Sequence, residues 1–242
     1  MQTTDKPLAV EVWSDIACPW CWVGKRNLEA ALAQYDGEAQ VRWRAFELNP
    51  SAPKSIDGDI DYVQKLATKY RVSRDGAQQM IDRMIETGAA VGLEFRFDRV
   101  RPVNTFDGHR LIAMAARDAD LDVHGAVSEA LFAAYMNQGR DVADRDTLVE
   151  IATSCGLDAD AAIAMLESDE LTEEVRADQA RSRSMGVTGV PFTVVGGVFG
   201  IPGAQPVRTL VNALGVAAAK VAELDDGVAF GEGAACDTDG CA

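Results

Sequence analysis

The sequence has few basic residues, few histidines and no long hydrophobic run. Its 242 residues include 23 Lys and Arg against 38 Asp and Glu, which gives a net charge of −15. This balance argues against nucleic acid or an anionic membrane surface as a partner. With only two histidines, His109 and His124, a metal centre built from several histidines is nearly excluded. No run of about 18 apolar residues occurs, so we expect no membrane span.

The first residues also lack an apolar stretch of the kind found in secretory signals. We therefore expect a cytoplasmic location, where structural disulfides are rare and those that do form are usually catalytic. The content of hydrophobic residues, 48%, is sufficient for a substantial core. The length predicts one large domain, or a small domain that carries an insertion.

Five cysteines form two close pairs and one singleton. The pairs are Cys18 with Cys21 and Cys236 with Cys241, and the singleton is Cys155. Because Cys155 follows an apolar helical pattern and precedes a glycine, we expect it to be a buried, inert thiol.

The first pair stands where an apolar run, residues 8–13, meets a helical pattern that begins at Pro19. Proline is favoured in the first turn of a helix, so Cys18 is predicted at the helix N-terminus. Unpaired N–H groups and the positive end of the helix dipole stabilise a thiolate there. Cys21 lies one turn further on the same face and can close a disulfide with Cys18. A strand followed by a C-x-x-C helix favours redox chemistry over an inert buried pair or half of a zinc site.

The rest of the pattern predicts an α/β unit interrupted by helices. Alternating apolar residues over 41–45 indicate a second strand, which a proline-rich stretch at 49–53 ends. Helical patterns then fill about 130 residues. Residues 190–201 predict a β-hairpin, and a last helix is expected from near Pro206 to near Leu224.

This order predicts four segments. We expect a first α/β part over residues 1–49, an inserted helical domain over residues 50–185 and a second α/β part over residues 186–224. Residues 225–242 are glycine-rich and acidic, and we expect them to form a flexible tail that carries the second cysteine pair.

The order of the elements resembles the thioredoxin superfamily, and the inserted helices resemble the DsbA family, in which a helical domain interrupts the thioredoxin-like fold at this point. The strings CPWCWVGK, NTFDGHRL, EVRADQARSRSMGVTGVPF and GAQP resemble the FrnE-like branch of cytoplasmic DsbA relatives. The resemblance implies a dithiol–disulfide oxidoreductase or isomerase that acts on disulfide-containing proteins or low-molecular-weight thiols. It implies a redox-active disulfide in place of a bound cofactor or metal, and it admits glutathione as a co-substrate.

Transferred to this sequence, the resemblance implies that Cys18 is the attacking cysteine and Cys21 the resolving one. Pro191 would be a cis-proline that faces the disulfide, with Val190 before it. A cis bond at this place turns the backbone of the preceding residue toward the cleft, where it can pair with an extended substrate. The position of Pro191 between a C-x-x-C helix and a hairpin favours the cis form, which is otherwise uncommon.

Other residues near the motif have supporting or structural roles in this interpretation. Pro19 and Trp20, between the cysteines, are expected to tune the thiolate. Glu11 approximates the buried carboxylate that related enzymes place beneath the resolving cysteine, although it is about one residue further from Cys18 than in that pattern. His109 is expected to be a packed histidine of the helical domain.

The second cysteine pair, Cys236 and Cys241, resembles a C-terminal pair found in some FrnE-like proteins. About twelve residues separate Cys236 from the predicted end of the last helix at Leu224, and this length spans roughly 40 Å when extended. We therefore expect this accessory pair to reach Cys18 and to exchange electrons with the first pair. The alternative is an acidic tail with incidental cysteines.

Two other functions stay open at this point. The 2-hydroxychromene-2-carboxylate isomerases and kappa-class glutathione transferases resemble this layout, but they typically carry serine where Cys18 stands and they bind glutathione. A non-enzymatic holdase, or a protein that binds zinc through both cysteine pairs, is the third possibility. The sequence indicates no oligomeric state.

Overall fold

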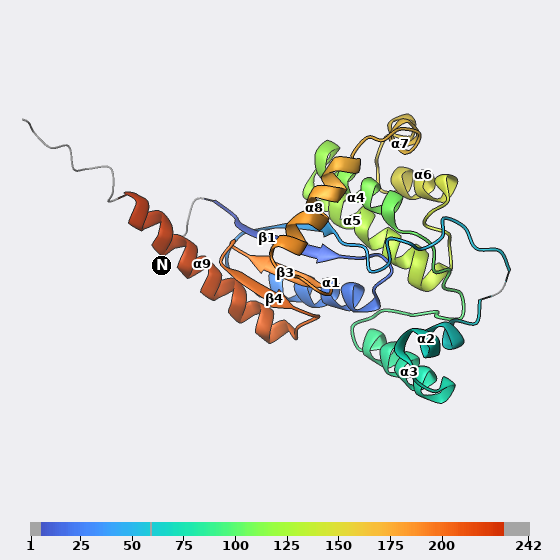
Figure 1. Cartoon of the computed structure of the whole chain (residues 1–242). Helices are drawn as coiled ribbons and strands as arrows, with labels where there is room; N and C mark the ends of the chain where they lie inside the picture. The colour runs from blue at the N-terminus through green and yellow to red at the C-terminus, as the bar shows by residue number, and fades with distance from the viewer. Residues whose placement is uncertain (1–5, 59, 230–242) are drawn as a thin grey trace, which may run out of the picture.

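A computed structural model describes residues 6–58 and 60–229, with side chains as far as Leu224. Its described part contains one sheet with the strand order β2-β1-β3-β4 (Figure 1). β1 is parallel to β2 and antiparallel to β3, and β3 is antiparallel to β4. The strands are β1 (Leu8–Ser14), β2 (Ala39–Ala45), β3 (Phe192–Val195) and β4 (Phe199–Pro202).

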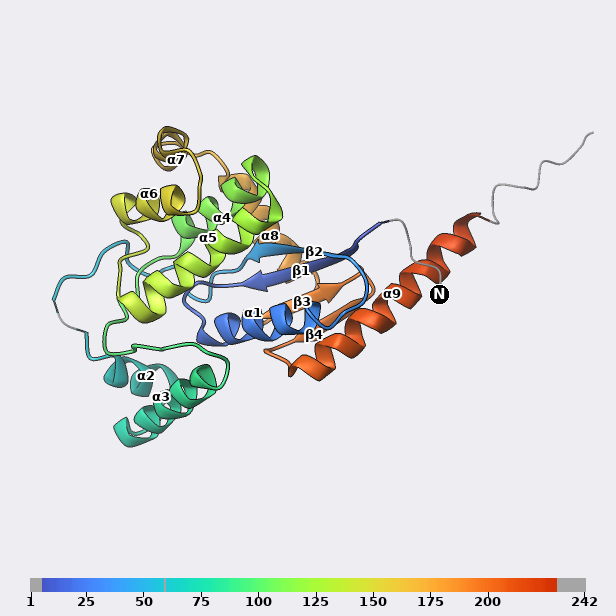
Figure 2. The same ribbon diagram turned by 180° about the vertical axis from the view of Figure 1, so that it is seen from behind.

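Helices cover both faces of this sheet (Figure 2). On one face, α1 (Pro19–Leu32) packs against α9 (Val207–Ala229). On the other, β2 is in contact with α4 (Phe106–Asp118), α5 (Leu121–Ala133) and α8 (Thr172–Ser184). The remaining helical segments between β2 and β3 are α2 (Tyr62–Tyr70), α3 (Arg74–Ala89), the π-helix η1 (Ala134–Gln138), α6 (Arg145–Ser154) and α7 (Ala159–Leu166).

The alternation of side chains along β1 decides which residues meet which layer. Leu8 lies beside α9, since both Leu8 and Ala217 would contact a Cβ placed at Gly196. Val10 and Val12 lie on the same face of β1 as Leu8, and both are buried. Trp13 faces the opposite layer, because its indole Nε1 donates a hydrogen bond to a carbonyl of α8.

Several helices begin at a polar residue whose side chain accepts a hydrogen bond from an N–H of the first turn. Such caps satisfy donors that the helix itself leaves unpaired. They are Asp61, Ser73, Asp120, Asp144 and Asp158. The sequence therefore sets the boundaries of the inserted helices locally.

The predicted fold class, a thioredoxin-like α/β fold with a large helical insertion, is confirmed. The last helix differs from the prediction, because α9 continues to Ala229 and does not end near Leu224. The alanine-rich residues before this point favour helix, and acidic residues alone do not terminate one. None of the described helices is both long and apolar enough to cross a bilayer.

Candidate active site

Cys18 occupies the N-cap position of α1, with Pro19 at the start of the helix. Its backbone N–H donates to the Asp15 carbonyl at 3.0 Å, and its own carbonyl accepts from Cys21 N at 3.0 Å. These bonds form the turn that leads from β1 into the helix. Within the described chain no side chain caps α1, so the positive end of its dipole acts on the Cys18 sulfur.

The segment before β3 faces this sulfur from across the site. The Val190–Pro191 peptide bond is cis, as predicted, and the Cys18 thiol donates to the Val190 carbonyl at 3.5 Å. Gly24 of α1 permits the close approach, since a Cβ at this position would lie 3.0 Å from Pro191 Cγ. Residues 172 positions apart thus meet at the start of α1.

Cys21 lies 3.4 Å from Cys18 and is the more deeply buried of the two. Both are free thiols. Burial raises the pKa of Cys21 well above that of an ordinary thiol, and the hydrogen bond and charge of Cys18 raise it further. The Asp15 backbone and the Ser14 side chain hydrogen-bond to Cys21 and act in the opposite direction. The thiol at the second position of the motif therefore keeps its proton more firmly than a free cysteine.

The residues between the cysteines differ in exposure. Trp20 is 48% exposed, whereas Pro19 is half-buried. The Trp20 indole therefore presents an apolar surface to solvent, and its predicted role in tuning the thiolate stays a prediction.

Glu11 has contacts other than those predicted for it. Its carboxylate accepts hydrogen bonds from Arg44 (2.6 Å) and Arg181 (2.6 Å). Although burial acts to raise the pKa of Glu11, these two guanidinium groups bring it below its usual value. The contacts arise because Glu11 shares the sheet face of Trp13 and α8. They hold Glu11 as an ion-paired carboxylate, which is a poor proton carrier for Cys21.

Asp15 is the carboxylate that the sequence analysis missed. It is only 1% exposed, and it accepts hydrogen bonds from Thr105 Oγ1 (2.9 Å), Ala17 N (3.1 Å) and Leu48 N (2.6 Å). Asp15 thereby joins the loop before Cys18 to the helical insertion. Its place directly after a buried strand was the available signal, since an acidic residue there must find donors.

His109 of α4 lies next to this carboxylate. The side chain is 3% exposed and its Nε2 is 3.6 Å from Asp15 Oδ1. Among the described residues, Nε2 has no hydrogen-bond partner. His109 is therefore packed, as predicted, but one of its polar atoms is not satisfied.

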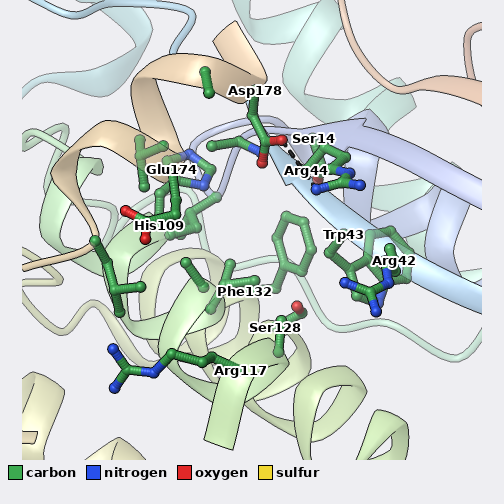
Figure 3. Close-up of a pocket in the computed structure, with 18 residues that line it drawn as sticks. Ser14, Arg42, Trp43, Arg44, His109, Arg117, Ser128, Phe132, Glu174 and Asp178 are labelled. Carbon is green, nitrogen blue, oxygen red and sulfur yellow. Dashed lines mark hydrogen bonds and ion pairs between the residues drawn. The ribbon is translucent and has the colours of Figure 1, made fainter. Parts of the chain in front are cut away.

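A cavity of about 410 Å³ lies between β2, α4, α5 and α8. In Figure 3, Asp178 and Arg44 meet at one end of it and Phe132 points into it from α5. Its lining has apolar walls and a polar end, and both Ser14 and His109 belong to it. Further lining residues are Ile16, Arg42, Trp43, Ile112, Arg117, Ser128, Glu174 and Val175.

Cys155 is the remaining cysteine of the described residues. Cys155 is half-buried at the C-cap of α6, so the prediction of a buried thiol is wrong. Cys236 and Cys241 lie outside the described residues. Residues 6–58 and 60–229 contain no group of three or more His, Cys, Asp or Glu side chains placed to hold a metal ion.

Comparisons with known proteins agree with this geometry. The model of the DSBA-like thioredoxin domain family matches residues 9–215. The chain is similar to the crystal structure of the probable DsbA oxidoreductase SCO1869 from Streptomyces coelicolor, with 37% identity, a TM-score of 0.77 and coverage of 97% of this chain and 98% of that one.

Two further relatives are more distant. The uncharacterized protein YwbO of Bacillus subtilis is 26% identical over 200 residues, which cover 81% of this chain and 90% of that protein. A 2-hydroxychromene-2-carboxylate isomerase shares the fold at 16% identity, with a TM-score of 0.63 and coverage of 89% of this chain and 98% of that one. The match of the family model over most of the chain decides the assignment: this protein belongs to the DSBA-like thioredoxin domain family.

Proposed function

We propose that this protein is a thiol–disulfide oxidoreductase in which Cys18 attacks a substrate disulfide and Cys21 resolves the mixed disulfide. The observation that carries the proposal is the position of the Cys18 sulfur at the start of α1, within 3.5 Å of the Val190 carbonyl and beside Cys21. A helix N-terminus stabilises the thiolate that performs exchange.

In the first step, the Cys18 thiolate forms a bond to one substrate sulfur, and the substrate S–S bond breaks. The other substrate sulfur leaves as a thiolate with the electron pair of that bond. In the second step, the Cys21 sulfur, once deprotonated, bonds to the Cys18 sulfur and displaces the first substrate sulfur. The substrate is thereby reduced by two electrons, and Cys18 and Cys21 become a disulfide. The reverse sequence oxidises a dithiol.

The surface around Cys18 favours an extended polypeptide as substrate. The exposed Trp20 offers an apolar contact, and the backbone at Val190 faces the attacking sulfur. A low-molecular-weight thiol such as glutathione would complete the cycle as a co-substrate, and the reaction needs no bound cofactor. We also propose a cytoplasmic location, in which such a thiol pool is present.

The fold does not by itself distinguish this function from that of the related isomerases, because the isomerase named above shares it. The sulfur of Cys18 is the distinguishing feature, since an intact cysteine pair provides two electrons that a serine at this place cannot. The assignment to the FrnE-like branch and the isomerase activity itself remain predictions.

Reduction of insulin and refolding of scrambled ribonuclease, assayed with full-length protein, test the proposal. We expect the wild type to catalyse at least one of the two reactions and Cys18→Ser to lose both. Cys155→Ser serves as the matched control, because it removes a thiol remote from α1, and it should retain full activity. Wild-type protein without activity in either assay, or equal activity in Cys18→Ser, would show the proposal to be wrong. Zinc analysis of the reduced protein separates it from the metal-binding alternative.

A further inference from the structure

The resolving step requires a proton acceptor on the inner side of the cysteine pair. Cys21 is 1% exposed, and Cys18, its neighbour on the outer side, is bound to substrate when Cys21 must react. A buried thiol cannot release its proton directly to bulk water. The side chain that performs this task must therefore be sought behind Cys21.

Asp15 has a structural role beside Cys18. Its carboxylate already holds the loop through hydrogen bonds from Thr105, Ala17 and Leu48. Transfer of a proton to it would weaken the bonds that position the turn before Cys18.

His109 has a ring nitrogen that is not used in any such structural bond within the described residues. Its imidazole is buried beside Asp15, and within the described chain Nε2 makes no hydrogen bond. His109 also lines the 410 Å³ cavity together with Ser14, whose side chain hydrogen-bonds to Cys21. A cavity of this size with polar groups at one end can hold water. The exposed side chains of Arg42 and Arg117 are part of its lining, and they connect it to solvent.

We propose that His109 is the proton acceptor of the resolving step. It takes up the proton of Cys21 through Ser14 and water in this cavity. The proposal rests on the proposed function. The S–H proton of Cys21 moves to the imidazole, the Cys21 sulfur bonds to Cys18, and the substrate sulfur leaves as a thiolate. The imidazolium then returns its proton to cavity water. Histidine is the side chain best suited to such exchange near neutral pH.

Charged groups on every adjacent element act on this imidazole. Asp15 faces it from the loop after β1, and Asp178 and Glu174 face the same cavity from α8. Arg44 of β2, which is paired with Asp178, carries the opposite charge, as do Arg42 and Arg117 of the same lining.

The test separates the two exchange steps in time. Reduced full-length protein with Cys155, Cys236 and Cys241 changed to serine is mixed with an aromatic disulfide whose released thiolate is coloured. The first equivalent of colour reports attack by Cys18, and the second reports resolution by Cys21. In His109→Gln at neutral pH, we expect the first phase to change less than twofold and the second to slow at least tenfold.

The second buried histidine provides the matched control. His124 is fully buried on α5 but is not part of the cavity lining. His124→Gln should leave the second phase within twofold of wild type. In His109→Ala, added imidazole should restore the second phase, which the loss of a purely structural side chain would not allow, and thermal unfolding of each variant reports its folding.

The outcomes are distinct. A slow second phase confined to the His109 variants, with rescue by imidazole, supports the proposal. An unchanged second phase in His109→Gln, an equal slowing in His124→Gln, or a folded His109→Ala without rescue would overturn it. Failure of the first phase in the wild type would instead contradict the proposed function and not the role of His109.

Discussion

Cys18, which is close to the exposed Trp20 in the sequence, contacts the Val190 carbonyl, whereas Cys21 lies toward Ser14, which lines the cavity between the sheet and the helical insertion. We refer to Cys18, Trp20 and Val190 as the outer side of the site, and to Cys21, Ser14 and His109 as its inner side. The proposed function assigns contact with the substrate to the outer side, and the further proposal assigns uptake of the Cys21 proton to the inner side. Two cysteines one helical turn apart thus acquire different chemistry from the layers that they face.

The two sides are built from different parts of the chain. The outer side unites the start of α1 with the segment before β3, both within the thioredoxin-like part. The inner side needs the helical insertion, because Thr105 and His109 of that insertion contact Asp15. The insertion is therefore more than a cover for the sheet, since it holds the carboxylate of the loop before Cys18.

The largest expected effect comes from removing the two thiols one at a time. Cys18→Ser should abolish exchange, because no thiolate remains on the outer side. Cys21→Ser should still attack but should accumulate a mixed disulfide at Cys18 that cannot be resolved. Mass spectrometry after incubation with a substrate disulfide detects the adduct. An adduct on Cys21 in the Cys18→Ser variant, formed at a similar rate, would contradict the division into two sides.

The two buried histidines, His109 and His124, allow a further test of the inner side. Burial, together with the charges of Arg42 and Arg44, lowers the pKa of His124 to about 4. Because an unfolded histidine binds a proton near pH 6.5, the unfolded state takes up more protons between pH 6.5 and about 4. Stability is thus lost as the pH falls through this window. The difference is equivalent to about 3 kcal/mol.

Urea unfolding at pH 7 and pH 4.5 measures this loss. His124→Gln should unfold with a smaller difference between the two pH values than the wild type, while exchange activity at pH 7 stays the same. An equal loss in both proteins would show that other groups dominate acid sensitivity.

A further comparison concerns two carboxylates, Glu11 within β1 and Asp15 in the loop after it. Glu11 is ion-paired with Arg44 and Arg181 on the α8 face, and Asp15 organises the loop at Cys18. Since the pKa of Glu11 is lowered on folding, its ion pairs stabilise the protein above the pKa of the unfolded residue, and this contribution is lost as the pH falls through the folded value. We expect Glu11→Gln to destabilise the fold by about 1–2 kcal/mol without slowing either exchange step.

Urea unfolding at pH 7 and the two-phase assay described above check this expectation together. A slower second phase in Glu11→Gln, with the first phase unchanged, would restore the proton-transfer role that the sequence suggested for this residue.

The helix start at Cys18 could be predicted from a local signal, the proline that follows it. The placement of Val190 and Pro191 opposite Cys18, 172 positions away, was implied by the family resemblance. The bond between Thr105 and Asp15 across 90 positions had neither kind of signal. Periodicity does not reveal such contacts. For Glu11, a shift of one residue along a strand places the side chain on the other face of the sheet, and its partners there are Arg44 and Arg181.

The last prediction concerns the second cysteine pair, Cys236 and Cys241, as a source of a thiol for the outer side. The length of α9 limits how far the chain that carries this pair can reach. α9 begins beside the active site, where Gly203 N donates to the Pro191 carbonyl at 2.8 Å, and it runs toward the opposite end of the sheet (Figure 1). At 1.5 Å per residue, the helix to Ala229 is about 33 Å long. The seven residues from Ala229 to Cys236 span at most about 25 Å when extended.

Because α9 continues to Ala229, the chain between the end of the helix and Cys236 is shorter than the roughly 40 Å predicted from Leu224. We therefore expect any electron exchange between the accessory pair and the first pair to occur between two chains. A variant that ends at Gly233 should turn over within about twofold of wild type at low protein concentration. In full-length Cys21→Ser, any disulfide between Cys18 and a tail cysteine should increase with protein concentration. A yield independent of concentration would show that the end of α9 unwinds and that exchange occurs within one chain.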